Sequence, residues 1–201
     1  MFYFAIFFVG YFLGAIPFGF IVAKINGINI FQEGSGNPGA TNVKRVVGNK
    51  WGVLVFVLDC LKGFVPVLIV KICYQTCVSQ ANNMGATLLI GLVLGHCYSI
   101  FLKFRGGKGV ATAIGGLAVL MPSALLLGII FWCSVFSITQ FVSLASLCFA
   151  LSLPLNAYLF AYQKEMIFLA LALMIIIFFR HSQNIRRLWK GEELRAHKIK
   201  E

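Results

Sequence analysis

Carboxylate side chains are scarce in this chain, and their scarcity limits its chemistry. Only six of the 201 residues are Asp or Glu, against 17 Lys and Arg, and Asp59 is the single aspartate. Hard divalent cations bind to clustered carboxylates, so we predict no metal site. The six cysteines form no C-x-x-C pair and lie near no histidine cluster, and we interpret them as small buried apolar residues. We therefore predict an activity that uses neither metal nor cofactor.

Familiar hydrolase and nucleotide-binding motifs are also missing. No G-x-S-x-G motif occurs, and none of the three histidines is followed by aspartate at the fifth position. These absences exclude the usual serine hydrolases and the His-x4-Asp acyltransferases. A P-loop would need glycine at position 102 and Ser or Thr at position 109, where Leu102 and Gly109 stand. Nucleotide hydrolysis therefore has no support.

Polar surface is too sparse for a soluble protein. Charged residues make up 11% of the chain and apolar residues 60%, and the mean hydropathy is +0.90. The Lys and Arg residues lie in short clusters between apolar runs, which is the positive-inside pattern of membrane proteins. We predict an integral membrane protein that contacts lipids and binds no nucleic acid. The basic tail is either a surface for anionic headgroups or simply solvated, and it contains Arg180, Arg186, Arg187, Lys190, Arg195, Lys198 and Lys200.

The apolar runs predict an all-α polytopic bundle of transmembrane helices, a single domain over residues 1–201 with a short basic tail. The cationic loops near Lys44 and Arg105 belong on the cytoplasmic side, which places the N-terminus outside. Residues 110–162 then cross the membrane once or three times, because the tail is also basic. We favour three crossings, and so seven helices, with five as the alternative. The other spans are expected at about residues 2–23, 51–72, 84–102 and 168–179.

Several residues inside these spans carry further information. Glycine pairs at a spacing of four, Gly10 with Gly14 and Gly91 with Gly95, predict close helix packing, and Pro17 predicts a kink. Asp59 and Lys62 are one helical turn apart in an apolar run, where ionisable groups are costly. We interpret them as a structural ion pair, with a direct catalytic role as the alternative. The polar residues 137–146 are expected to bring Ser143 back to the cytoplasmic face.

Residues 34–45 form a glycine-rich polar segment that resembles an anion site. Asn37 is a preferred helix N-cap and Pro38 suits a first helical position, so a helix is predicted to begin at Pro38. Its free N–H groups would point toward Gly34, Ser35 and Gly36. Thr41 and Asn42 would share a helix face with Arg45. The alternative is an ordinary polar loop.

Two further polar segments could complete such a site. The loop 103–109 combines Lys103, Arg105 and Lys108 with three glycines, whose N–H groups we expect to be free for phosphate; the alternative is a loop that only sets topology. In the tail, His181 and Asn184 are three residues apart. If the tail is helical, Arg180, Asn184 and Arg187 form one polar stripe. His181 could serve as a general base, because its ordinary pKa is near neutrality.

With these segments in place, the sequence resembles the bacterial integral-membrane glycerol-3-phosphate acyltransferases that use acyl phosphate as donor. The resemblance covers nearly the whole chain, and Arg105 stands where lysine is more usual. Five segments carry it in order: Gly34 to Val43 with Arg45, Asp59 to Gly63, His96 to Thr112, Ser143 to Ser146, and His181 to Glu193.

This resemblance implies transfer of a fatty acyl group from acyl phosphate to the 1-hydroxyl of glycerol 3-phosphate. The products would be 1-acylglycerol 3-phosphate and inorganic phosphate, and the fold would have seven helices. The phosphate-binding residues of the family correspond to Ser35, Asn37, Arg45, Lys108, Ser143, His181 and Asn184. Either His181 or the departing phosphate would accept the proton of the hydroxyl.

We thus expect an enzyme of the bacterial cytoplasmic membrane whose site faces the cytoplasm. A small-anion or lipid-phosphate transporter is the main alternative, and a structural subunit is a third. The residues expected in catalysis are Ser35, Arg45, Lys108, His181 and Asn184. Those expected to bind substrate are Gly34, Gly36, Asn37, Thr41, Asn42, Arg105, Gly106, Gly107, Ser143 and Arg187.

Overall fold

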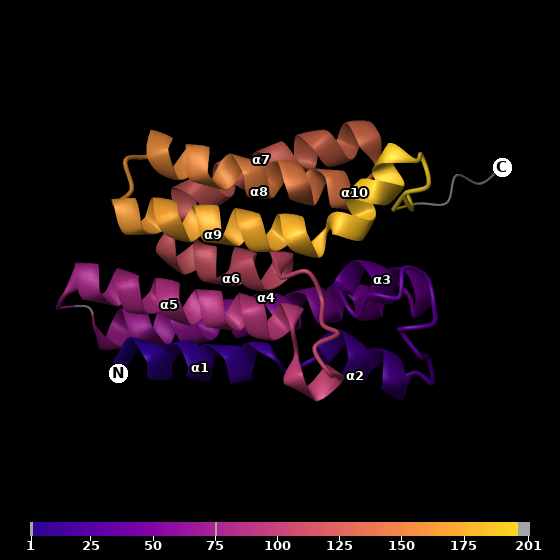
Figure 1. The fold of residues 1–201 in the computed structure, drawn as a ribbon, viewed down its shortest axis with the longest axis horizontal. Coiled ribbons are helices and arrows are strands. Elements are labelled where there is room, and N and C mark those ends of the chain that lie inside the picture. Colours follow the sequence, from indigo (N-terminus) through magenta and orange to yellow (C-terminus); the bar gives the residue numbers. More distant parts are fainter. Residues whose placement is uncertain (1, 75, 197–201) are drawn as a thin grey trace.

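The computed structural model describes residues 2–74 and 76–196, and every regular element in these residues is a helix. The prediction of an all-α fold is therefore confirmed. The helices, shown in Figure 1, are α1 (Phe2–Gly14), α2 (Phe18–Ile25), α3 (Ala40–Val46), α4 (Asn49–Cys73), α5 (Val78–Cys97), the short 3-10 helix η1 (Ile100–Leu102), α6 (Val110–Leu120), α7 (Pro122–Thr139), α8 (Val142–Leu159), α9 (Lys164–Arg180) and α10 (Ser182–Trp189). The tail residues Lys198 and Lys200 lie outside the described residues.

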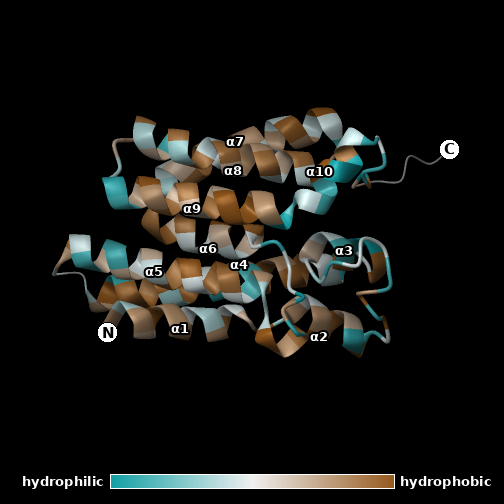
Figure 2. Ribbon diagram, in the orientation of Figure 1, coloured by the Kyte–Doolittle hydropathy of each residue, from teal (hydrophilic) through white to brown (hydrophobic). Residues whose placement is uncertain are grey.

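The long helices run side by side in two groups (Figure 1). One group contains α1, α4 and α5, the other contains α7, α8 and α9, and α6 lies between them. Helix α1 packs on α5, α4 packs on α6, and α8 packs on both α7 and α9. Figure 2 shows hydrophobic residues along the long helices and hydrophilic residues toward the ends, notably around α3 and α10. The polar segments therefore gather at one end of the bundle.

The lengths of the helices fit a membrane protein. Five helical segments are long and apolar enough to cross a bilayer, and a sixth results if α9 and α10 are joined across their 59° bend. Residues 110–162 form three helices, as the seven-helix prediction requires, but α6 has only 11 residues. At 1.5 Å per residue α6 is about 16 Å long, roughly half of an apolar bilayer core. Seven crossings, and the sidedness of the termini, stay predictions.

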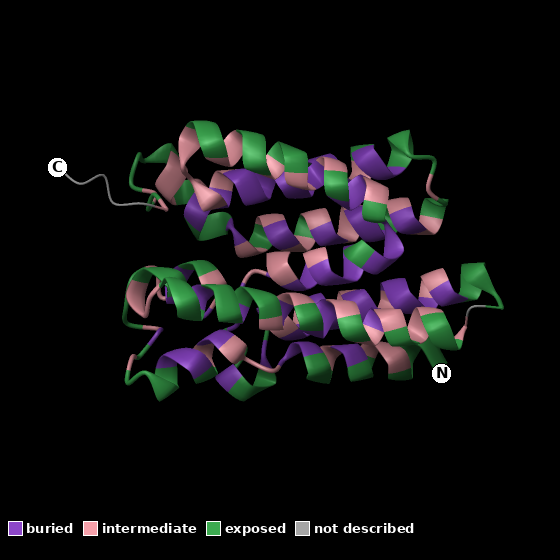
Figure 3. Ribbon diagram, turned by 180° about the vertical axis from the view of Figure 1, so that it is seen from behind, coloured by how far each residue is buried: buried purple, intermediate pink, exposed green. Residues whose placement is uncertain are grey.

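Burial is distributed as the membrane setting requires. Figure 3 shows buried residues on the facing sides of the helices and exposed residues on their outer sides. Many of the exposed side chains are large and apolar, including Leu126, Ile130 and Phe168, each at least 60% exposed. The expectation that all the cysteines are buried is wrong: Cys97 is buried, but Cys73, Cys77 and Cys133 are exposed. A small apolar side chain fits a lipid-facing surface as well as a core.

The predicted glycine packing is confirmed between α1 and α5. A Cβ on Gly10 or Gly14 would overlap the backbone of Leu88 or Leu92, and one on Gly91 or Gly95 would overlap the backbone of α1. The two helices thus approach until their backbones touch. The kink expected at Pro17 is an interruption of the helix, because α1 ends at Gly14 and α2 begins at Phe18, and the two helices together still form one span-length segment, Phe2–Ile25.

Candidate active site

A cavity of about 370 Å³ lies at the polar end of the molecule. Three segments that are distant in the sequence form its wall: the loop before α3, the loop between η1 and α6, and the α9–α10 corner. Its lining residues are Phe31, Ser35, Gly36, Asn37, Pro38, Phe104, Arg105, Gly106, Lys108, Phe179, Arg180, Ser182, Gln183, Asn184 and Arg187. The three polar segments singled out in the sequence therefore meet in one site.

The first glycine-rich segment does not form the predicted helix start. Helix α3 begins at Ala40 with Gly39 as its N-cap residue, and it has only seven residues. The Oδ1 atom of Asn37 accepts the N–H of Gly39 at 2.9 Å, a local turn with the same bond that an N-cap at Asn37 would make, but the regular helix begins only at Ala40.

The side chain of Asn42 holds this segment by hydrogen bonds to two of its backbone groups. Its buried Oδ1 accepts the N–H of Ser35 at 2.9 Å, and its Nδ2 donates to the carbonyl of Glu33 at 3.0 Å. Gly34 has a φ of +60°, and a Cβ there would overlap Asn42. Asn42 therefore holds Ser35 at the cavity wall from behind. Neither Gly34, Thr41 nor Asn42 lines the cavity.

The second glycine-rich loop is held close to α5. The N–H groups of Gly106 and Gly107 donate to the carbonyls of Cys97 and His96 at 3.2 and 3.0 Å, so they are not free for phosphate as predicted. A Cβ on Gly107 would overlap the ring of His96. These glycines are therefore needed for close backbone approach. The loop presents two cationic side chains to the cavity, Arg105 and Lys108, and Lys108 is bonded to Asn184.

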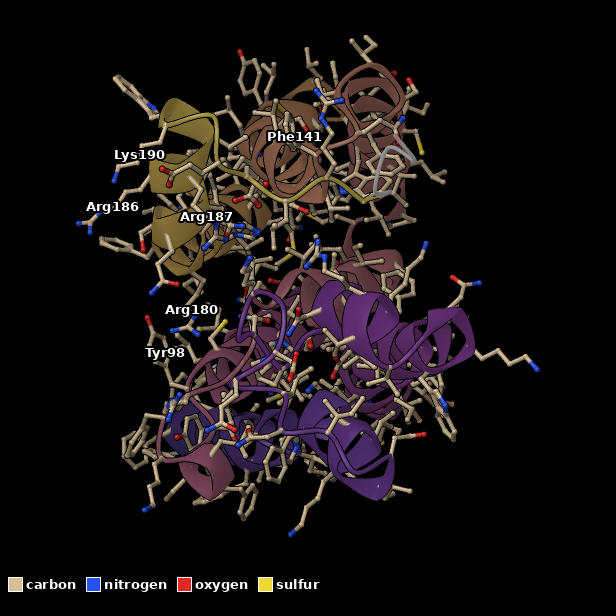
Figure 4. All side chains as sticks on the ribbon, turned by 90° about the vertical axis from the view of Figure 1, so that its right-hand side faces the viewer. Tyr98, Phe141, Arg180, Arg186, Arg187 and Lys190 are labelled. Carbon is tan, nitrogen blue, oxygen red and sulfur yellow. The ribbon has the colours of Figure 1, made fainter. Side chains whose placement is uncertain are left out.

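A chain of polar contacts links this loop to α10. Lys108 donates to Oδ1 of Asn184 at 2.5 Å, and Nδ2 of Asn184 donates to Glu193 at 2.6 Å. Glu193 also accepts from Nε of Arg187 at 2.7 Å, and its side chain is only 6% exposed. Figure 4 shows Arg187 pointing into the space between the two helix groups, whereas Arg186 and Lys190 point outward. One face of α10 thus belongs to the site.

The predicted polar stripe of the tail is not a single helix. The axis turns by 59° between α9 and α10, at His181. Even so, the cavity is lined by Arg180, Asn184 and Arg187, because the bend places residues of both helices along the edge of the cavity. Arg180 donates from Nε to Gly107 at 3.0 Å and from Nη2 to Gly106 at 2.9 Å, with the carbonyl oxygens as acceptors.

Three of the residues that the resemblance implies do not line the cavity: Arg45, which is exposed on α3, and His181 and Ser143, which are buried. His181 is 3% exposed, and its Nδ1 lies 2.8 Å from the carbonyl oxygen of Ile177. Because a carbonyl only accepts, Nδ1 carries the hydrogen, and Nε2 of the neutral ring is left as an acceptor. Ser143 is 5% exposed, and its hydroxyl has no partner. It lies at the start of α8, at the α10 end of the bundle, and the cytoplasmic location of this end stays a prediction.

Asp59 and Lys62 form the expected ion pair, with Lys62 Nζ and Asp59 Oδ1 at 2.7 Å. Both side chains are almost fully buried, and Lys62 also donates to the carbonyl of Ile16 at the break after α1. His96 Nδ1 lies 3.5 Å from the same carboxylate oxygen. The pair borders a small void of about 10 Å³ that shares Pro38 and Gly106 with the wall of the larger cavity, and the pair itself does not line that cavity. Its position supports a structural role.

The charge balance of the cavity is strongly cationic. Burial lowers the pKa of Lys108 to about 8; Glu193 raises it, and Arg187, Arg180 and Arg45 lower it further. Arg45 itself is exposed on α3 and contacts Asn42 at 3.5 Å. Among the described residues, no group of three or more His, Cys, Asp and Glu could hold a metal ion. The site is therefore suited to anionic oxygens.

Sequence reasoning did not assign a role to two residues of this site. The sequence places Arg180 in the basic tail and in the polar stripe with Asn184 and Arg187, and Glu193 in a matched segment, without a specific role for either. The signal for Glu193 is the scarcity of carboxylates, since the acidic pair Glu192 and Glu193 among so many cations of the tail calls for an explanation. Arg180 gives no such signal, because its partners lie 73 and 74 residues away.

Comparison with known proteins agrees with this geometry. Residues 4–191 match the family model described as glycerol-3-phosphate acyltransferase. Curated proteins of that name from Aquifex aeolicus and Maridesulfovibrio salexigens are 43% and 44% identical, over 92% and 91% of this chain and 94% and 91% of theirs.

Solved structures are similar as well. The glycerol 3-phosphate form of PlsY, an integral membrane glycerol 3-phosphate acyltransferase, superposes with a TM-score of 0.89 at 39% identity, covering 97% of this chain and 96% of that one. Its lysophosphatidic acid form gives 0.86 at 40% identity, covering 97% and 95%. These matches span almost the entire bundle, including all three segments that form the cavity. The chain therefore belongs to the glycerol-3-phosphate acyltransferase family and is an integral-membrane acyltransferase.

Proposed function

We propose that the cavity between α3, the Gly106–Gly109 loop and α10 binds acyl phosphate together with glycerol 3-phosphate. The acyl group passes to the 1-hydroxyl of glycerol 3-phosphate, which gives 1-acylglycerol 3-phosphate and inorganic phosphate. The observation that carries this proposal is the buried carboxylate of Glu193, which Asn184 and Arg187 hold close to Lys108. A site that holds one anionic group among several cations has the chemistry needed for phosphoryl oxygens.

In this proposal the two substrates are bound by residues of the cavity wall together with Arg45, which lies on α3 outside the wall. Two phosphorylated substrates repel one another, and Arg45 and Lys108 offset that repulsion. Ser35, Asn37 and Asn184 supply hydroxyl and amide donors, and Arg187 and Arg105 add charge at the rim. Donors arranged in advance stabilise the negative charge that develops on the carbonyl oxygen during attack.

Acyl phosphate is a mixed anhydride and is already activated, so the protein need not generate a strong nucleophile. The glycerol hydroxyl oxygen attacks the acyl carbon, the bond between that carbon and the bridging phosphate oxygen breaks, and phosphate leaves. The hydroxyl proton goes to the departing phosphate. His181 does not line the cavity, so we assign it no part in removing this proton, and Nε2 is the acceptor nitrogen of its neutral ring.

Substitution of His181 by glutamine tests the route of this proton. If phosphate accepts the proton, His181→Gln retains kcat within about tenfold of wild type, because glutamine keeps a polar group of similar reach. General-base catalysis is typically worth about 10²–10⁴-fold. A loss of that size, in a protein that elutes as wild type does in detergent, would assign the proton to His181.

The membrane placement follows from charge. The cavity, the basic face of α10 and the cationic loops lie at the same end of the bundle, and positive-inside logic puts that end in the cytoplasm. We therefore place the enzyme in the bacterial cytoplasmic membrane with its site at the inner leaflet. There it would meet water-soluble glycerol 3-phosphate and a lipid-soluble donor.

The test is an assay of the purified protein in detergent micelles. With acyl phosphate and glycerol 3-phosphate, we expect lysophosphatidic acid and inorganic phosphate in equal amounts. Acyl thioesters serve as the comparison donors. Product from thioesters alone would overturn the assignment of the donor. Flux of anions in sealed vesicles without product in micelles would favour the transporter instead.

A further inference from the structure

The Gly106–Gly107 backbone is held on two sides. Toward α5, both N–H groups are occupied by the carbonyls of His96 and Cys97. Toward α9, both carbonyl oxygens accept from Arg180, at 2.9 and 3.0 Å. A loop of glycines has little conformational preference of its own, so these bonds fix its path.

Arg180 is suited to this contact by its shape. Its planar guanidinium spans two neighbouring carbonyls and also lies 4.8 Å from the centre of the Tyr98 ring. A lysine ammonium could not make both bonds in one plane while stacking on the ring. Figure 4 shows Arg180 beside Tyr98 at the edge of the gap between the helix groups. Arg180 therefore joins the two groups where the loop passes.

The carbonyl of Gly107 belongs to the peptide bond that leads into Lys108. Because that peptide is planar and trans, the direction of the carbonyl also fixes the direction of the Lys108 N–H. The side chain of Lys108 then reaches Asn184, four residues after Arg180 on the other side of the bend. Backbone and side chain of Lys108 are thus both held by the α9–α10 corner.

We propose that Arg180 is a positioning residue for acyl transfer, which holds the carbonyls of Gly106 and Gly107 and thereby aims Lys108 at the phosphoryl group. The inference rests on the proposed role of Lys108 in binding phosphate. It differs from a role for Arg180 as a direct ligand of substrate, because Arg180 then acts only through Lys108.

The experiment compares Arg180→Lys with a matched control, Arg186→Lys, which changes an outward-pointing arginine on the neighbouring helix. Displacement of a reacting group by about 1 Å can cost about 10²-fold. We expect Arg180→Lys to lower kcat/KM for glycerol 3-phosphate by about 10- to 100-fold, and Arg186→Lys to change it less than about twofold. Elution and melting temperature in detergent report whether each variant is folded.

Arg180→Lys made in a Lys108→Met background distinguishes a role that acts through Lys108 from an independent role of Arg180. A residue that acts only through Lys108 has nothing left to position, so Arg180→Lys should then cost less than about twofold more. If Arg180→Lys lowered kcat/KM in this background by the full 10- to 100-fold, Arg180 would bind substrate or support the fold independently of Lys108. That result would overturn the inference. Wild-type activity of Arg180→Lys would overturn it too, while leaving the role of Lys108 intact. Wild-type activity of Lys108→Met would instead reject the proposed function.

A pH profile provides a second readout that a purely structural role would not change. Removing the charge in Arg180→Gln should move the alkaline limb of kcat/KM to higher pH, whereas Arg180→Lys should leave it in place. An unmoved limb in a folded Arg180→Gln variant would place Arg180 away from Lys108 and contradict the inference. The charged groups that act on Lys108 are Glu193, Arg187, Arg180 and Arg45, with the ring of His181 nearby.

Discussion

Replacement of Lys108 by methionine is expected to lower kcat/KM for glycerol 3-phosphate by about 10²- to 10³-fold, because it removes a preorganised cation from a largely buried site. Methionine keeps the length of the side chain, so the loss reports charge and not volume. The control is Lys190→Met on the outward face of α10. If Lys108→Met kept more than a tenth of the wild-type value, the cavity would not be the phosphate site that we propose.

The charge of Lys108 also predicts the direction in which kcat/KM changes with pH. With a pKa lowered to about 8, Lys108 is charged below that pH and neutral above it. The profile of kcat/KM reports groups of the free enzyme, so activity should fall as the pH rises through about 8. Arginine stays charged throughout this range, so Lys108→Arg should lose this limb whatever its absolute rate. A wild-type profile that is flat from pH 7 to 10 would contradict the assignment.

Breaking the buried ion pair is expected to have the largest effect on stability. Asp59→Leu leaves Lys62 without its carboxylate partner inside the bundle, and such changes cost about 3–5 kcal/mol. The double variant Asp59→Leu, Lys62→Met removes both charges and should recover most of that loss. The measurement is the unfolding midpoint in detergent micelles.

Activity of the double variant decides between the two interpretations of the pair. A structural pair predicts kcat within about threefold of wild type once stability is restored. A double variant that is stable but inactive would show that Asp59 or Lys62 takes part in the reaction. Asp59→Leu without any loss of stability would mean that Lys62 finds enough compensation in the carbonyl of Ile16.

The features predicted well from the sequence are those set by local spacing in helices. Asp59 and Lys62 are one turn apart and pair because a helix brings them together. Gly10 and Gly14 mark a helix face that α5 approaches closely. Hydropathy could not show where α6 ends, since residues 110–136 are almost uniformly apolar and α6 is unusually short.

The details of the site were less predictable, because side chains there compete for backbone partners. Asn37 could cap a helix or form a local turn, and only the fold shows that the turn is preferred. The glycines 106 and 107 looked like free N–H donors, but α5 supplies acceptors for both. Arg180 and Glu193 acquire their roles only through partners from other segments or from the folded tail.

We place α3, which carries Arg45, and the loop that carries Lys108 on the same, cytoplasmic, side of the membrane. Thr41 on α3 and Lys103 in the loop after η1 are exposed positions and suit single-cysteine labelling after the six native cysteines are replaced. A membrane-impermeant maleimide should label Thr41→Cys and Lys103→Cys in inverted membrane vesicles and neither in intact spheroplasts. Labelling of the two positions from opposite faces of the membrane would contradict the account.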